Sequence, residues 1–169
     1  MKSASYEFEA FCHAQYTRVI GSMTLYTGDA ELAREIAQEA LARACADWRK
    51  VRSMDNPGPW LHRVATNLAN SHFRRRRYEA RVKERIDLPG ASELATNADA
   101  LVLRDRIARL PRRQKTALIF RYFLDLSVEE TAEQMGCASH TVKKLTGRAI
   151  QTLRQDPTLH DLREDAGVS

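Results

Sequence analysis

The residues best suited to chemistry in this sequence are polar and cationic side chains spaced to share one face of a helix. Thr141, Lys144 and Arg148 recur at intervals of three and four residues, a spacing that places side chains on one side of an α-helix. Such a face can enter a major groove and contact phosphates and base edges. The alternative is a solvated basic helix face. The full candidate set is Ser139, His140, Thr141, Lys143, Lys144 and Arg148.

A second stripe of the same kind precedes it in the chain. Arginine and asparagine residues recur there at intervals of four, three, four and three. Asparagine amides can read bases and arginines can hold phosphates, so this stripe also predicts contact with nucleic acid. A run of consecutive arginines is also common at a solvated helix end, and the second stripe is therefore less specific. Its members are Arg63, Asn67, Asn70, Arg74 and Arg77.

The distribution of charge supports two separate contacts with a polyanion. The formal net charge is +5 and the pI is about 9.3. Residues 43–85 carry 12 basic and 4 acidic side chains, and residues 104–154 carry 11 basic and 5 acidic ones. Residues 1–42, 86–103 and 155–169 are each net acidic. Two basic segments separated by an acidic one are expected where each segment neutralises phosphates.

The same residues argue against an enzyme. The three cysteines, Cys12, Cys45 and Cys137, lack CxxC spacing, and we expect them to be small buried side chains. The histidines form no HExxH pattern, and neither a nucleophile elbow nor a phosphate-binding glycine loop is present. We therefore expect no catalytic residue, no metal and no cofactor. No apolar run approaches membrane-spanning length and no apolar leader opens the sequence, so we expect a cytoplasmic protein without membrane insertion.

Apolar residues recur at helical spacing throughout, which predicts an all-α fold. The first domain, residues 1–86, should contain a helix over about 6–26 and a second helix capped by Asp29, whose apolar stripe ends at Trp48. Residues 53–59 form a loop by composition, with Pro59 in the first turn of a third helix that runs from Trp60 to about Arg85.

The second domain, residues 98–155, should contain four shorter helices, over about 98–109, 112–124, 128–135 and 140–154. Ser127 and Glu130 form a capping box, Gly136 can close the turn that follows, and Ser139 can cap the last helix. Two short helices joined by a tight turn predict a helix-turn-helix. A flexible linker, residues 87–97, separates the domains, and a frayed acidic tail covers residues 156–169.

Five short motifs in this order resemble the extracytoplasmic-function sigma factors, which consist of two domains called region 2 and region 4. EIAQEAL at residues 35–41 and WLHRVATNLAN at residues 60–70 resemble region 2. LPRRQK at residues 110–115, LSVEETA at 126–132 and TVKKLTGRA at 141–149 resemble region 4. The resemblance covers residues 6–154 and implies a region 2 bundle of three or four helices and a four-helix region 4.

The resemblance also implies partners and roles. Glu35, Gln38 and Glu39 would dock on the clamp of the largest subunit of core RNA polymerase, and region 4 would contact the flap of the second-largest subunit. The loop would capture a flipped base of the promoter −10 element through Ser53 and Asn56, and the stripe from Arg63 to Arg77 would bind there as well. The last helix would read the −35 element, and an anti-sigma factor could occlude the protein.

Two other classes of protein remain as alternatives. One is a helix-turn-helix regulator that binds DNA without joining the polymerase, although residues 6–85 offer no evident dimer surface or ligand pocket. The other is an adaptor that binds proteins alone, which would leave both cationic stripes without a role.

Overall fold

The chain divides into two compact units, Met1–Ser92 and Glu93–Ser169. The computed structural model describes residues 2–82 and 98–159. Across these two ranges every regular element is helical and no strand occurs, which confirms the predicted all-α fold. The predicted linker lies outside the described residues, and so do residues 160–169 of the predicted tail.

The first unit contains a long helix, a sharp reversal and a second helix that returns beside it. Gly28 makes the reversal with a φ of 77°, a left-handed conformation that glycine adopts without steric cost. The Asp29 carboxylate then accepts hydrogen bonds from the backbone N–H groups of Glu31 and Leu32 at 2.9 and 3.1 Å, which confirms it as the helix cap. The helices of this unit are α1 (Lys2–Thr27), α2 (Ala30–Ala46), α3 (Trp48–Val51) and α4 (Pro57–Val82).

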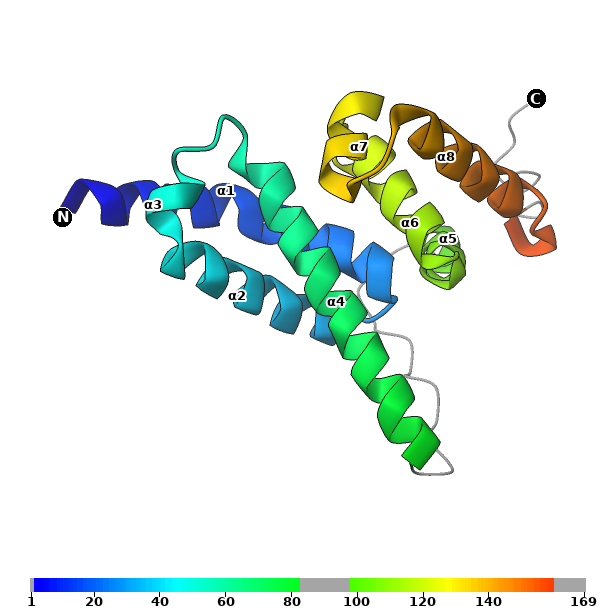
Figure 1. Ribbon diagram of the computed structural model, residues 1–169. Coiled ribbons are helices and arrows are strands. Elements are labelled where there is room, and N and C mark those ends of the chain that lie inside the picture. The colour runs from blue at the N-terminus through cyan, green and yellow to red at the C-terminus, as the bar shows by residue number, and fades with distance from the viewer. Residues whose placement is uncertain (1, 83–97, 160–169) are drawn as a thin grey trace. The chain divides into compact units, whose positions relative to one another are not determined.

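The core of the first unit lies between α1, α2 and α4, with α4 crossing the antiparallel α1 and α2 (Figure 1). The small side chains of α2 allow this close packing, because Ala33, Ala37, Ala40 and Ala44 are fully buried. The predicted stripe of α2 is confirmed up to Ala44 and is wrong at Trp48, since α2 ends at Ala46.

The third predicted helix begins earlier than its composition indicated. Pro57 is the first residue of α4, and Pro59 lies in its first turn as predicted. Proline suits this place because the first backbone N–H groups of a helix have no partner within the helix. The loop between α3 and α4 is consequently short and consists of residues 52–56.

The second unit contains α5 (Ala98–Arg109), α6 (Arg112–Leu118), η1 (Ile119–Phe123), α7 (Val128–Met135) and α8 (Ser139–Arg154). Its core includes Leu110, Leu118 and Ala149, with Ile107 and Leu153 packed against them. The predicted helix over 112–124 changes to a wider π-helical turn after Leu118. The N–H of Leu124 donates to the carbonyl of Ile119, five residues back, at 3.0 Å.

Two further expectations differ from the structure. Cys45 is exposed, because it follows the buried Ala44 and turns away from the core. Cys12 and Cys137 are half-buried. The start of the predicted frayed tail contacts α5, where Arg106 lies 3.3 Å from the carboxylate of Asp156 and donates to the hydroxyl of Thr158 at 3.1 Å.

Candidate nucleic-acid and partner interfaces

Local hydrogen bonds build the helix-turn-helix of α7 and α8. The Ser127 hydroxyl accepts from the N–H of Glu130 at 3.0 Å, and the Glu130 carboxylate accepts from the N–H of Ser127 at 2.7 Å. The hydrogen bond from the Ser127 backbone N–H lowers the pKa of Glu130, and the Ser127 side chain lowers it further. Gly136 ends α7 with a φ of 59°, and the N–H of Cys137 donates to the carbonyl of Ala132 at 3.0 Å. The capping box and the left-handed turn are therefore confirmed.

The α8 helix turns its cations outward. Val142 and Ala149 are fully buried against the rest of the unit, and Thr146 is buried with them. The predicted residues on the opposite side are exposed, with Thr141 half-buried at the edge of that side. The exposed ones are His140, Lys143, Lys144 and Arg148.

Ser139 does not cap α8. The cap position belongs to Ala138, which makes no side-chain capping bond, and Ser139 is the first residue of the helix and half-buried. Ser139 lies three residues before the buried Val142 and seven before the buried Thr146, spacings that keep it on the packed side of α8.

One residue of the outward face of α8, Gln151, was missed. Gln151 is exposed three residues after Arg148 and seven after Lys144, so helical spacing could have identified it. Gly147 lies between Lys144 and Arg148 in the sequence and is exposed. A Cβ atom added there would meet no heavy atom within 4 Å. A partner can therefore approach the backbone of α8 closely at this point.

The α4 stripe is exposed except at one residue. Arg63, Asn67, Arg74 and Arg77 all face solvent. Asn70 instead is half-buried, and its side-chain oxygen accepts a hydrogen bond of 2.8 Å from the hydroxyl of Tyr26. Asn70 thus joins α4 to α1, and we leave it out of the candidate nucleic-acid surface.

An aromatic side chain extends this stripe and was also missed. Tyr78 is 72% exposed and lies four residues after Arg74 and eleven after Asn67, a spacing that keeps all three on one face. An exposed aromatic ring among arginines is suited to stacking on a base. The signal was visible in the sequence as a tyrosine directly after four arginines.

The loop before α4 presents polar groups to solvent. Ser53 and Asn56 are both exposed. The Ser53 hydroxyl donates to the carbonyl of Lys50 at 2.7 Å, so its lone pairs remain open to a donor such as a base amino group.

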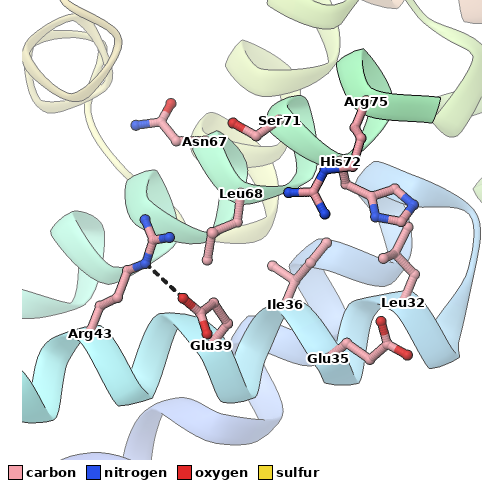
Figure 2. Close-up of a pocket in the computed structure, with 10 residues that line it drawn as sticks. All are labelled: Leu32, Glu35, Ile36, Glu39, Arg43, Asn67, Leu68, Ser71, His72 and Arg75. Carbon is pink, nitrogen blue, oxygen red and sulfur yellow. Dashed lines mark hydrogen bonds and ion pairs between the residues drawn. The ribbon is translucent and has the colours of Figure 1, made fainter. Parts of the chain in front are cut away.

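The predicted polymerase-binding residues lie on the exposed side of α2. Glu35 and Glu39 line a groove of about 280 Å³ between α2 and α4, whereas Gln38 is exposed but lies outside the groove lining. Figure 2 shows Arg43 turned toward Glu39, and these side chains form an ion pair at 3.0 Å. The complete lining is Leu32, Glu35, Ile36, Glu39, Arg43, Asn67, Leu68, Ser71, His72 and Arg75.

Two buried basic groups lie inside the units rather than on these surfaces. Burial lowers the pKa of His62 to about 4, with a smaller effect from the charge of Arg18, and Nδ1 of its ring lies 2.8 Å from the hydroxyl of Ser22. Burial also lowers the pKa of Lys115 to about 8. Its ammonium donates to the carbonyl of Ala108 at 2.8 Å, near the end of α5.

Within residues 2–82 and 98–159, no group of three or more His, Cys, Asp and Glu side chains could hold a metal ion. In the same ranges, no helix combines the length and apolar character needed to cross a membrane.

A helix-turn-helix with a cationic outward face in one unit, and a helical bundle with an arginine-rich helix in the other, define a two-domain helix-turn-helix protein. Residues 13–78 match the family described as Sigma-70 region 2, and residues 100–153 match Sigma-70, region 4. The chain belongs to the sigma-70 family of RNA polymerase sigma factors, in its extracytoplasmic-function group, which confirms the resemblance drawn from its motifs.

Individual relatives extend over most of the chain. The RNA polymerase sigma-E factor of Streptomyces coelicolor is 27% identical over 157 residues, which cover 92% of this chain and 89% of the relative. The sigma factor SigV of Bacillus subtilis is 30% identical over 141 residues, covering 81% and 82%. The sigma factor RpoE of Bartonella quintana, solved in complex with the anti-sigma factor NepR, has the same fold, with a TM-score of 0.80, 21% identity and coverage of 88% and 95%.

Proposed function

We propose that this chain binds core RNA polymerase and directs promoter-specific initiation of transcription by recognising −10 and −35 elements. The observation that carries the proposal is the presence, in one chain and in order, of both sigma regions, the second with an exposed cationic face on its helix-turn-helix. The proposal assigns binding roles to the chain and no catalytic step. It also assigns the chain to the cytoplasm, where polymerase and promoter DNA meet.

For the −35 element we propose that α8 enters the major groove. Exposed Lys144 and Arg148 support this role, because a guanidinium can donate two hydrogen bonds to the edge of a guanine. Such a pair of bonds favours the correct base over an incorrect one by about 1 to 3 kcal/mol. Arg148→Ala should therefore weaken binding to the −35 element about tenfold or more. Arg154→Ala removes an exposed cation from the end of the same helix and serves as the matched control. Equal losses for the two variants would contradict a specific role for Arg148.

For the −10 element we propose that the loop of residues 52–56 captures one extruded base through Ser53 and Asn56. Extruding a base costs a few kcal/mol, which polar contacts in a shaped site must offset. Exposed arginines and Asn67 on α4 would hold the phosphates of the adjoining strand. The arginines concerned are Arg63, Arg74 and Arg77.

For the polymerase we propose that the acidic side of α2 docks on the clamp of the largest subunit, and that region 4 contacts the flap of the second-largest subunit. Glu39 is 54% exposed, and its ion pair with Arg43 spans one helical turn. Such an exposed pair is worth only about 0.3 to 0.5 kcal/mol, so it can open at little cost when a basic partner arrives. Glu39→Ala should weaken core binding and leave DNA binding by region 4 unchanged. Promoter loss with unchanged core affinity would overturn this assignment.

Run-off transcription with core polymerase and the purified protein tests the whole proposal. Transcripts that start only at matching promoters and require both components would support it. Binding to a palindromic site without polymerase would instead favour a regulator that acts alone.

We also propose an anti-sigma factor as a partner, by analogy with the Bartonella protein that was solved with NepR. A candidate anti-sigma protein should abolish run-off transcription when it is mixed with this chain before core polymerase is added. Full transcription at saturating anti-sigma protein would exclude that candidate.

A further inference from the structure

The loop of residues 52–56 is held at both ends by α1, although α1 lies far away in the sequence. We propose that the N-terminal half of α1 sets the conformation of the base-reading loop, with Glu7, Phe8 and Phe11 as positioning residues. The inference rests on the proposed reading of a −10 base by Ser53 and Asn56. It assigns α1 no contact with DNA.

An aromatic cluster fixes the helix from which the loop emerges. The ring of Trp48 packs against Phe8 with centroids 5.1 Å apart and an interplanar angle of 69°. It also packs against Phe11 at 5.3 Å and 42°. Both distances lie in the favourable range for aromatic pairs. The indole N–H of Trp48 is buried and meets no hydrogen-bond partner in the part of the chain that the structure describes. Ring packing, rather than a hydrogen bond, therefore determines where Trp48 sits.

The position of Trp48 is transmitted to the loop through one helical turn. Trp48 begins α3, and Val51 ends it with no exposed surface. The N–H groups of Ser53 and Met54 donate to the carbonyls of Lys50 and Val51 at 3.2 and 3.1 Å. A shift of the indole would therefore carry α3 and Ser53 with it.

An ion pair orients the first loop residue. The guanidinium of Arg52 lies 3.2 Å from the carboxylate of Glu7, and the two side chains are 45% and 47% exposed. An exposed pair of this kind contributes little to stability. It joins residues 45 apart in the sequence. Because Arg52 directly precedes Ser53, the ion pair influences the direction of the loop.

The other end of the loop meets α1 as well. Gly58, in the first turn of α4, is buried, and a Cβ atom there would lie 3.3 Å from the side-chain oxygen of Gln15. The exposed Asn56 is thus two residues from a second close contact with α1. Loosening α1 should weaken the preference of the loop for one base without altering the polymerase-binding side of α2.

The test compares base preference in variants of the full chain. Run-off transcription with core polymerase is measured on promoters that carry each of the four bases at each −10 position. Glu7→Gln should reduce the rate ratio between the best and worst base at the position that the loop reads by about 1.5- to 5-fold. Phe8→Leu, which keeps an apolar side chain but loses the ring contact, should reduce it by about 2- to 10-fold. Discrimination at −35 and affinity for core polymerase should match the parent.

Glu9→Gln is the matched control because it removes the same charge from an exposed carboxylate of α1 two residues away. Its rate ratio should equal that of the parent, and an effect as large as that of Glu7→Gln would overturn the inference. Parental ratios in both Glu7→Gln and Phe8→Leu would overturn it too. Ser53→Ala and Asn56→Ala examine the underlying site, because unchanged base preference in both would show that the loop does not read a base at all.

Discussion

Acid should destabilise the first unit through His62, a histidine that is only 2% exposed. Burial holds its pKa at about 4, against 6.5 for an ordinary histidine. Between these values the unfolded chain binds a proton that the folded chain does not, so stability falls as the pH falls from about 6.5 to 4. Each unit of pKa difference corresponds to about 1.36 kcal/mol, so protonation lowers the free energy of unfolding by about 3.4 kcal/mol in full. About 2 kcal/mol of this is lost by pH 5.

Tryptophan fluorescence can isolate this effect, because Trp48 and Trp60 are the two tryptophans of the chain and both lie in the first unit. Urea titrations give the free energy of unfolding at each pH. Between pH 7.5 and pH 5, this free energy should fall by about 2 kcal/mol more in the parent than in His62→Asn. Asparagine does not titrate and can still reach the hydroxyl of Ser22, which lies 2.8 Å from the His62 ring. The control His13→Asn replaces an exposed histidine and should keep the parental pH dependence. An equal loss in His62→Asn and the parent would refute the reasoning, whatever the stability of the variant at pH 7.5.

Three other substitutions have defined expectations. Ser127→Ala removes the hydroxyl of the capping box and should lower the stability of the second unit by about 1 kcal/mol in thermal unfolding followed by circular dichroism; an unchanged midpoint would contradict the role of the box. Gly147→Ala should raise that stability by about 1 kcal/mol, since a Cβ atom there meets no heavy atom within 4 Å. If α8 approaches DNA at Gly147, the same variant should bind −35 DNA more weakly in a mobility-shift assay, and a gain in both quantities would argue against that approach. Tyr78→Ala should weaken holoenzyme binding to a single-stranded −10 oligonucleotide about tenfold by fluorescence anisotropy, whereas Tyr6→Ala, which removes a tyrosine 74% exposed on α1, should not.

The sequence alone determined the features that depend on neighbours within one or two helical turns. The Asp29 cap, the capping box of Ser127 and Glu130, and the left-handed Gly136 each use hydrogen bonds or backbone angles between residues at most five apart. Helical spacing also placed Lys144 and Arg148 on the outer face of α8. These features could be predicted because residue type and short-range spacing are sufficient to specify them.

Tertiary structure decided what depends on contacts between distant segments. Asn70 has the spacing of a DNA-binding residue, but the hydroxyl of Tyr26, 44 residues away, binds its side chain. Trp48 has the spacing of the α2 stripe, but it packs on Phe8 and Phe11 from α1. A repeating pattern shows which residues share a face, and the packing of the other helices decides how much of that face remains open. For this protein, the sequence therefore predicted two DNA-binding helices, and only the fold showed which of their side chains are available to DNA and how α1 reaches the loop.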